Sequence, residues 1–301
     1  MRVLVTGSSG FLGRAVVAAL RLHGHDVSTM HRGVDATHRG DIRDRDVVGQ
    51  AVSGVEAVCH LAALAKVRDS FNRPAEYWST NVVGTLNVLE ALAAASDSGS
   101  PKSLVLASTS AVYGTPERQP MDEETPTVPS NPYGRSKLAA DQAAADVAQL
   151  GAIGVTTLRA FNIAGSSGGQ PDPDLTRLIP KVLAVQAGTE PKLTVNGNGS
   201  AVRDFVHVED AAEAFALALP ACTPGQWRAY NLGATRASVA EVIQEAEKVT
   251  GRPAPLLHRP PANEPPTLVA DSTRARQELG WQPKKSELPQ ILRDAWDALN
   301  C

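Results

Sequence analysis

A tyrosine and a lysine, Tyr133 and Lys137, stand four residues apart in the sequence Tyr-Gly-Arg-Ser-Lys. If Pro132 begins a helix, both side chains lie on one face of that helix. An adjacent cation favours the phenolate, and it is expected to pull the tyrosine pKa from about 10 toward neutrality. Tyr133 is therefore a candidate general base or acid for a hydroxyl group.

Three glycines, Gly7, Gly10 and Gly13, follow a strand-like segment and precede an apolar helical pattern. This context is typical of the turn that binds the pyrophosphate of a dinucleotide. Such a turn must be tight, its backbone must approach the phosphates closely, and a helix N-terminus must point at them. We expect Gly7, Gly10, Phe11 and Leu12 to contact the cofactor.

The end of the second predicted strand is unusual, because His31 and Arg32 stand where an acid should bind the adenosine ribose. Arg32 could meet a ribose 2′-phosphate, which would favour NADP, or it could be an ordinary solvated arginine. The sequence leaves both interpretations open. In the next loop, we expect Asp41 and Ile42 to flank the adenine.

Short apolar segments alternate with helix-length segments, which is the pattern of a parallel sheet covered by helices. The predicted strands are Arg2–Thr6, Asp26–Thr29, Ala57–Leu61, Ser103–Ser108 and Val155–Ala160. The predicted helices are Phe11–Leu22, Asn81–Ala95 and Tyr133–Leu150, with a surface loop at Ser96–Pro101. The long connection Pro116–Pro132 holds five prolines and an acidic cluster, residues 122–124, which we expect to be solvated.

The expected fold is therefore α/β, a Rossmann-type doubly wound parallel sheet with a smaller C-terminal substrate-binding region. Residues 1–165 are expected to form the dinucleotide-binding domain, and residues 201–235 to return to it. After Gly165, segments rich in glycine and proline separate shorter elements and the alternation is less regular. Residues 166–200 and 236–301 are therefore assigned to the substrate region, at the carboxyl ends of the sheet.

Composition narrows the class of protein. The chain has 301 residues, 43% hydrophobic and 20% charged, and a net charge of -3, so no basic surface argues for nucleic acid or an anionic membrane. Cys59, Cys222 and Cys301 show no paired spacing, so neither a disulfide framework nor a metal site is expected. No signal-peptide pattern or segment of about 20 apolar residues is present. We expect a soluble cytoplasmic enzyme.

Taken together, these motifs resemble the extended short-chain dehydrogenase/reductase superfamily, in its NAD-dependent nucleotide-sugar epimerase/dehydratase branch. The resemblance covers nearly the whole chain. Besides Tyr133 and Lys137, it rests on Thr6–Gly13, His60–Ala63, Asn81–Thr85, Ser108–Gly114, Arg159–Asn162, Arg203–Val208 and Tyr230–Gly233.

The resemblance implies roles for individual residues. Tyr133 would act as the base, Lys137 would bind the nicotinamide ribose, and Thr109 would bridge the sugar hydroxyl to the tyrosine. Further cofactor contacts are implied at Leu61, Ala62, Ala63 and Asn81.

The same resemblance implies a site for a nucleotide diphosphate, held by Asn162 and Arg203. An arginine fork matches phosphate oxygens bidentately, which supports that role. A second diphosphate arginine, usual late in such chains, is displaced here, and Arg259 is the nearest candidate. Alignment through Val269–Asp271 places Thr267 at the gate of the sugar pocket. A small residue there would admit a uronic acid or an N-acetylhexosamine.

Three reactions share such a scaffold, and the residues after Thr109 separate them. Dehydratases carry an acid pair there, whereas this chain has Ser110 and Ala111, which cannot eliminate water. The resemblance then implies an NAD-dependent 4-epimerase of a UDP-sugar, acting through a transient 4-keto intermediate. UDP-glucose, UDP-glucuronate and UDP-N-acetylhexosamine are the candidate substrates.

Two alternatives stay open at this stage. An NADP-dependent nucleotide-sugar 4-ketoreductase is favoured by Arg32, and a non-catalytic dinucleotide sensor would have no need for Thr109, Tyr133 and Lys137. Relatives often pair through two helices, and Asn81–Ala95 and Tyr133–Leu150 have the small-residue composition for that. We expect a homodimer, but an alanine-rich helix face that packs inside its own domain would have the same composition.

Overall fold

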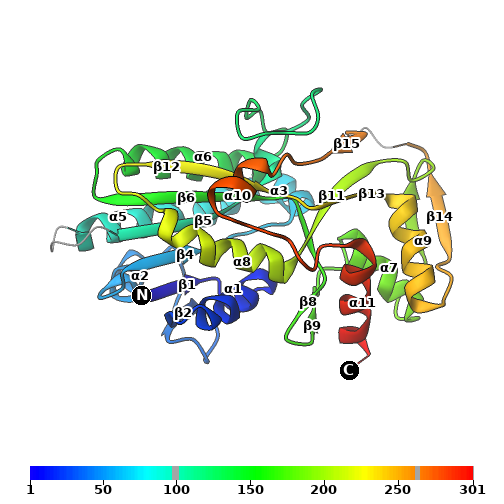
Figure 1. Ribbon diagram of the computed structural model, residues 1–301, viewed down its shortest axis with the longest axis horizontal. Helices are drawn as coiled ribbons and strands as arrows, with labels where there is room; N and C mark the ends of the chain where they lie inside the picture. The colour runs from blue at the N-terminus through cyan, green and yellow to red at the C-terminus, as the bar shows by residue number, and fades with distance from the viewer. Residues whose placement is uncertain (97–101, 262–264, 301) are drawn as a thin grey trace.

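A seven-stranded parallel sheet forms the centre of the computed structural model, which describes residues 1–96, 102–261 and 265–300 (Figure 1). The strand order is β12-β6-β5-β4-β1-β2-β3, and every neighbouring pair is parallel. Helices cover both faces of this sheet. The predicted fold class, a Rossmann-type doubly wound α/β sheet, is confirmed.

All five predicted strands are present, with ends that differ by no more than two residues. Two further strands, β3 and β12, complete the sheet at its edges. The strands of the sheet are β1 (Arg2–Thr6), β2 (Asp26–His31), β3 (His38–Arg39), β4 (Ala57–His60), β5 (Lys102–Thr109), β6 (Ile153–Ala160) and β12 (Trp227–Leu232).

Two apolar cores flank the sheet. One face is covered by α1 (Phe11–Leu22), α8 (Val208–Ala218) and α10 (Thr273–Glu278). The opposite face is covered by α2 (Arg45–Val52), α5 (Gly84–Ser96) and α6 (Pro132–Ala148). Short elements connect these layers: α3 (Val67–Asn72), α4 (Pro74–Tyr77), the π-helical turn η1 (Trp78–Val83) and the 3₁₀ turns η2 (Ser110–Val112) and η3 (Leu219–Ala221).

The helix predicted at Asn81–Ala95 therefore begins within a π-helical turn, and its α-helical part starts at Gly84. The helix predicted at Tyr133–Leu150 starts one residue earlier, at Pro132, and ends at Ala148. Asn131 caps this helix by accepting a 2.8 Å hydrogen bond from the amide of Gly134. Proline fits at the first helical position because a backbone N–H there would have no acceptor within the helix.

A smaller sheet and three helices lie at the carboxyl ends of the main strands, at the right of Figure 1. The sheet consists of β7 (Asn162–Ala164), β11 (Val202–His207), β13 (Thr235–Ser238) and β15 (Thr267–Leu268). Two strand pairs lie apart from it: β8 (Ser166–Ser167) with β9 (Gln170–Pro171), and β10 (Leu193–Asn196) with β14 (Leu256–Arg259). A third apolar core joins α7 (Leu178–Gln186), α9 (Val239–Thr250) and α11 (Leu288–Leu299).

The strand order reverses between β1 and β4, so the loops after these two strands lie at one edge of the sheet. Ligands bind at such a point in open α/β sheets. None of the helices within the described residues is long and apolar enough to cross a membrane. In the same residues, no group of three or more metal-ligating side chains is placed to hold an ion. Residues 97–101 of the predicted loop, and Cys301, lie outside the described part.

Candidate active site

The glycine turn after β1 is packed so closely that side chains are excluded from it. Gly7 has a φ of 68°, and its amide donates a 2.9 Å hydrogen bond to the carbonyl of Met30 on β2. A Cβ at Gly7 would lie 2.6 Å from the amide nitrogen of Ala62, and a Cβ at Gly13 would lie 2.2 Å from the Gly7 carbonyl oxygen. Glycine is therefore required at both positions.

Polar groups of this turn are left open toward the carboxyl edge of the sheet. Gly10 is the N-cap of α1 and offers no side-chain hydrogen bond to the first amides of the helix. The Ser8 hydroxyl oxygen is buried and has no hydrogen-bond partner among the described residues. Phe11 and Leu12, both half-buried, form the first turn of α1. Open amides at a helix N-terminus suit a pyrophosphate, so these residues fit a dinucleotide.

The end of β2 carries no acid. The Nδ1 of His31 accepts a 3.0 Å hydrogen bond from the amide of Gly33, so we assign the ring proton to Nε2, which lies 3.8 Å from an Asp35 carboxylate oxygen. Arg32 is exposed. An imidazole N–H at this position can donate a hydrogen bond to a ribose hydroxyl, whereas an acid would accept one from it.

In the following loop, Asp41 is held by Arg43 through two hydrogen bonds of 2.9 and 2.7 Å. These bonds lower the pKa of the Asp41 carboxyl to about 2. The Ile42 side chain is buried in the core, where it faces Gly84 of α5. Contacts of this pair with an adenine would therefore involve an already paired carboxylate and main-chain atoms.

The loop after β4 is fixed to β1 through a buried threonine. The Thr6 hydroxyl oxygen accepts hydrogen bonds from the amides of Leu61 and Ala62, both 3.2 Å long. It also lies 2.7 Å from Nδ1 of His60, whose Nε2 lies 3.1 Å from the Thr85 hydroxyl. Burial lowers the pKa of His60 to about 3, so this imidazole is neutral. The arrangement places Leu61 and Ala62 beside the glycine turn.

Asn81 is fully buried and its amide is saturated. Its Oδ1 accepts from the amide of Leu64 at 2.8 Å, and its Nδ2 donates to the Leu64 carbonyl and the Ser136 hydroxyl at 3.0 and 2.9 Å. Asn81 thus ties the segment that carries Ala63 to helix α6. Its side-chain N–H groups are both used within the protein, so the structure gives it a positioning role.

Thr109, Tyr133 and Lys137 converge at the carboxyl edge of the sheet. Thr109 is the last residue of β5, whereas Tyr133 and Lys137 lie on the first two turns of α6. A hydrogen bond joins the Thr109 hydroxyl to the phenol oxygen of Tyr133. The structure therefore brings together the three residues predicted to be catalytic.

The protonation states differ from the sequence prediction. Burial raises the pKa of Tyr133, while the hydrogen bond from Thr109 and the charge of Arg177 lower it less strongly. The prediction that Lys137 pulls this pKa toward neutrality is wrong for the protein alone, because desolvation of the phenolate outweighs the nearby charges. Burial also lowers the pKa of Lys137 to about 8, against the attraction of Asp141.

Two residues near Tyr133 had no signal in the sequence. The Tyr77 ring meets the Tyr133 ring edge-on, with 6.2 Å between centroids and an 80° angle between planes. Arg177, just before α7, places its charge near the phenol and pairs with Asp172 at 2.8 Å and Asp174 at 3.8 Å. Tyr77 and Arg177 each lie more than 40 residues from Tyr133 in the sequence, so no local pattern reveals their approach.

The residues predicted to bind substrate lie mainly on the smaller sheet. Asn162 on β7, Arg203 on β11 and Thr267 on β15 occupy neighbouring strands. Asn162 donates a 2.8 Å hydrogen bond to the carbonyl of Asp204, and Arg203 donates to two main-chain carbonyls. Arg259 is exposed on β14, which belongs to the separate β10–β14 pair. The structure thus groups the first three and leaves Arg259 apart from their sheet.

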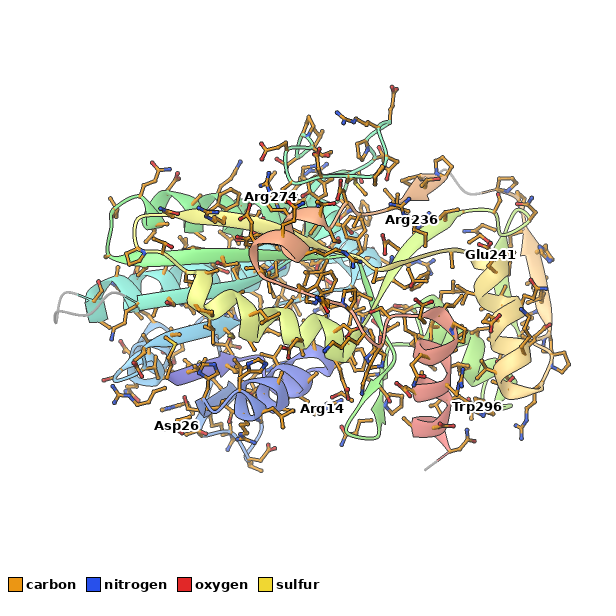
Figure 2. The ribbon with its side chains drawn as sticks, viewed as in Figure 1. Arg14, Asp26, Arg236, Glu241, Arg274 and Trp296 are labelled. Carbon is orange, nitrogen blue, oxygen red and sulfur yellow. The ribbon has the colours of Figure 1, made fainter. Side chains whose placement is uncertain are left out.

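The sequence predicted that the acidic cluster at 122–124 is solvated, but the structure shows that it is not uniformly so. The Glu123 side chain is only 4% exposed, and it accepts a 2.7 Å hydrogen bond from the amide of Asn231 on β12. Arg274, labelled in Figure 2, lies 3.7 Å from Glu123 and 2.7 Å from Glu124. The prediction is wrong for Glu123 because β12 offers it a main-chain donor that only the tertiary fold supplies.

A glycine turn at the strand-order reversal, together with threonine, tyrosine and lysine at the same sheet edge, defines a dinucleotide-dependent α/β enzyme of the short-chain dehydrogenase/reductase type. The model of the NAD dependent epimerase/dehydratase family matches residues 3–233. The chain belongs to that family.

Similar proteins share nearly the full length of the chain. A UDP-glucose 4-epimerase of Corynebacterium glutamicum is 41% identical over 98% of this chain and 95% of its own length. Among solved structures, a UDP-glucose-4-epimerase from Stenotrophomonas maltophila, with bound NAD and formylated UDP-arabinopyranose, has a TM-score of 0.91 at 31% identity and covers 100% and 98% of the two chains. MoeE5 in complex with UDP-glucuronic acid and NAD has a TM-score of 0.88 at 29% identity, covering 100% and 99%.

Proposed function

We propose that the protein is an NAD-dependent 4-epimerase of a UDP-sugar, with UDP-glucose as its substrate. The observation that carries the proposal is the grouping of Thr109, Tyr133 and Lys137 beside an open glycine turn. The relative that is 41% identical bears the name UDP-glucose 4-epimerase, which favours this sugar.

The chemistry follows from the positions of these side chains. NAD bound at the glycine turn would accept hydride from C4 of the sugar and return it to the opposite face of the transient 4-keto sugar. Tyr133 takes the proton of the C4 hydroxyl, assisted by the hydrogen bond from Thr109. The Lys137 ammonium stabilises the phenolate form of Tyr133, which is the form that takes this proton.

The nucleotide end of the substrate is assigned to the smaller sheet. Asn162 and Arg203 bind the diphosphate, with Thr267 close to the sugar on the adjacent strand. Binding energy taken from this remote group lets the reacting ring stay loosely held, so it can turn between the two hydride transfers. Arg259 keeps its proposed diphosphate role only if β14 closes toward that sheet.

One assay separates this proposal from its alternatives. Purified protein is given UDP-glucose without added cofactor, and UDP-galactose is measured. A second aliquot is denatured, and the released dinucleotide is identified as NAD or NADP. Oxidation of NADPH on a 4-keto sugar, with no epimer formed, would support the ketoreductase instead. Bound dinucleotide with neither reaction would support the sensor.

A second substrate, UDP-glucuronate, is favoured by one observation. Arg177 places a positive charge near the Tyr133 phenol, where the sugar must lie. Its ion pairs with Asp172 and Asp174 offset that charge, so a uronate would have to compete with two carboxylates. If the uronate is used, Arg177→Met should lower its kcat/KM while leaving that of UDP-glucose nearly unchanged.

We also propose that two copies of the chain pair through an apolar surface, here called the helical patch, made of Val67, Phe71, Trp78, Val83 and Leu86. These side chains are between 37% and 60% exposed. They lie on α3, η1 and α5, elements that pack on one another or on α6. Exposed apolar side chains gathered on adjacent helices are typical of a protein interface.

The division into two regions stays a proposal. We assign residues 1–165 to cofactor binding and residues 166–200 and 236–301 to substrate binding. Strand β12 lies in the main sheet, which supports the return of 201–235 to the first region, whereas β11 of the same segment lies in the smaller sheet. A cytoplasmic location is also proposed, supported by the free thiols of the buried Cys59 and Cys222.

A further inference from the structure

Lys137 carries a buried ammonium group that makes no hydrogen bond within the described residues. The residue is 3% exposed. The ionisable groups that face it are His60 from β4, which is neutral, Tyr133 one helical turn before it, and Asp141 one turn after it. Asp141 is the one anion in this set.

Asp141 is a buried carboxylate that reaches neither the glycine turn nor the substrate strands in any contact described. It is 1% exposed, and its Oδ2 accepts hydrogen bonds from the Ser108 hydroxyl at 3.1 Å and from Nε of Arg159 at 3.3 Å. Its Oδ1 is also buried and has no hydrogen-bond partner among the described residues. A buried carboxylate with one oxygen unused is costly unless a nearby charge offsets it.

Arg159, which binds this carboxylate, is itself held by several contacts. Its NH1 donates a 3.0 Å hydrogen bond to the Tyr113 hydroxyl, which in turn donates to Oδ1 of Asn231 at 2.7 Å. The guanidinium also lies over the rings of Tyr113 and Trp227, 5.2 and 5.7 Å from their centroids. These contacts hold Arg159 in place. Burial raises the pKa of the Asp141 carboxyl, whereas the charges of Arg159 and Lys137 oppose that rise and favour the ionised form.

We propose that Asp141 is a positioning residue for Lys137: its buried carboxylate, anchored by Ser108 and Arg159, keeps the Lys137 ammonium charged. Residues four apart on a helix have Cβ atoms about 5–6 Å from each other, within reach of an ammonium and a carboxylate. This deepens the proposed function and rests on it for the part that Lys137 plays in turnover. The electrostatic relation between the two side chains does not depend on the substrate.

The charge of Asp141 matters because Lys137 is close to losing its own. Burial lowers the pKa of Lys137 to about 8, and Asp141 is the neighbour that raises it. An opposite charge within about 4–6 Å moves a pKa by about 1 unit or more. Without it, the protonated fraction of Lys137 at pH 8 would fall from about one half to about one tenth, roughly fivefold.

The test measures the protonation of Lys137 directly in the full-length protein. Competitive acetylation with acetic anhydride is carried out across a pH series, and the extent of labelling of the Lys137 peptide is read by mass spectrometry. In Asp141→Asn, the apparent pKa of Lys137 should fall by about 1 unit or more. The matched control, Asp146→Asn, makes the same change at an exposed position of α6 and should leave it unchanged. An unchanged pKa in Asp141→Asn would overturn the proposal.

A second variant covers the case in which Asp141→Asn does not fold. Asp141→Glu keeps the negative charge, so its Lys137 pKa should stay close to that of the parent. A fall of a full unit despite the retained carboxylate would also refute the positioning role. Because the labelling needs no sugar, a shifted pKa in a protein that turns over no UDP-sugar would defeat the proposed function alone. Where turnover is measured, the alkaline limb of kcat should move to lower pH in Asp141→Asn.

Discussion

At the scale of single residues, burial of the Lys137 ammonium lowers the free energy of unfolding of the protein. The pKa of Lys137 falls from 10.5 to about 8 on burial. The unfolded chain therefore binds more protons between pH 8 and 10.5, so the destabilisation is fully present below pH 8 and fades as the pH rises. At about 1.4 kcal/mol per pKa unit, it is about 3 kcal/mol.

Lys137→Met should therefore stabilise the protein while abolishing turnover. The free energy of unfolding, measured by urea titration of cofactor-free protein, should rise by up to about 3 kcal/mol at pH 7. The gain should shrink toward zero at pH 10.5. Equal stability of the two proteins at pH 7 would show that the buried ammonium is better compensated than its environment indicates.

Tyr133 gives a second test at this scale. Tyr133→Phe removes the hydroxyl that bonds Thr109 but keeps the ring that packs edge-on against Tyr77. Turnover should fall by about 10²- to 10⁴-fold, the usual range for a general acid or base, while bound dinucleotide is retained. Tyr230→Phe is the control, because the Tyr230 hydroxyl on β12 donates a hydrogen bond to Glu278 of α10. Substantial epimerase activity in Tyr133→Phe would remove Tyr133 as the base.

Motifs identified the residues of the site, but not their environment. Tyr133 and Lys137 could be predicted because their spacing on one helix is a local property of the sequence. The direction of the Tyr133 pKa could not, since it depends on how deeply tertiary packing buries the ring. The nearness of Arg177, and the burial of Glu123 against β12, likewise depend on contacts between distant segments.

At the scale of elements, the turn between β1 and α1 can be tested by adding single methyl groups. Gly13→Ala would place a Cβ 2.2 Å from the Gly7 carbonyl oxygen, and Gly7→Ala would add strain at a φ of 68°. Each should destabilise the protein by about 1–3 kcal/mol and reduce the dinucleotide content. The measurements are urea titration and the amount of dinucleotide released on denaturation.

Gly49 offers the matched control. It lies within α2, and a Cβ added there would meet no heavy atom within 4 Å. Gly49→Ala should stabilise the protein by about 0.5–1 kcal/mol, because alanine loses less backbone entropy in a helix. If all three variants behaved alike, close packing of the turn would not be the reason for its glycines.

The elements that could be predicted are those with a clear apolar pattern. The strands β1, β4, β5 and β6 have at least half of their residues buried, and the short apolar segment within each of them reveals it. Strand β3 has two polar residues, His38 and Arg39, and pairs only because β2 extends beyond its predicted end. The π-helical turn at Trp78–Val83 was also not predicted, because its residues read as helix or loop equally well.

At the scale of the whole molecule, the helical patch predicts the oligomeric state. An apolar surface of this kind is costly to leave in water, and a second copy can cover it with the same surface by a twofold axis. Sedimentation equilibrium should therefore give twice the mass of the chain. Leu86→Arg, on α5, would bury an unpaired charge in that interface and should raise the dimer dissociation constant by at least about 30-fold.

Leu22→Arg separates this effect from a general loss of apolar surface. Leu22 ends α1 on the other face of the sheet and is 88% exposed, so the same substitution there should leave the dimer intact. The helical patch lies on η1 and α5, which contact α6, the helix that carries Tyr133 and Lys137. Dimer formation would therefore stabilise α6. Leu86→Arg should then lower turnover at protein concentrations below the dissociation constant of the variant dimer. A monomeric parent protein would contradict the proposed dimer. A monomeric Leu86→Arg variant with full activity would contradict the dependence of turnover on dimer formation.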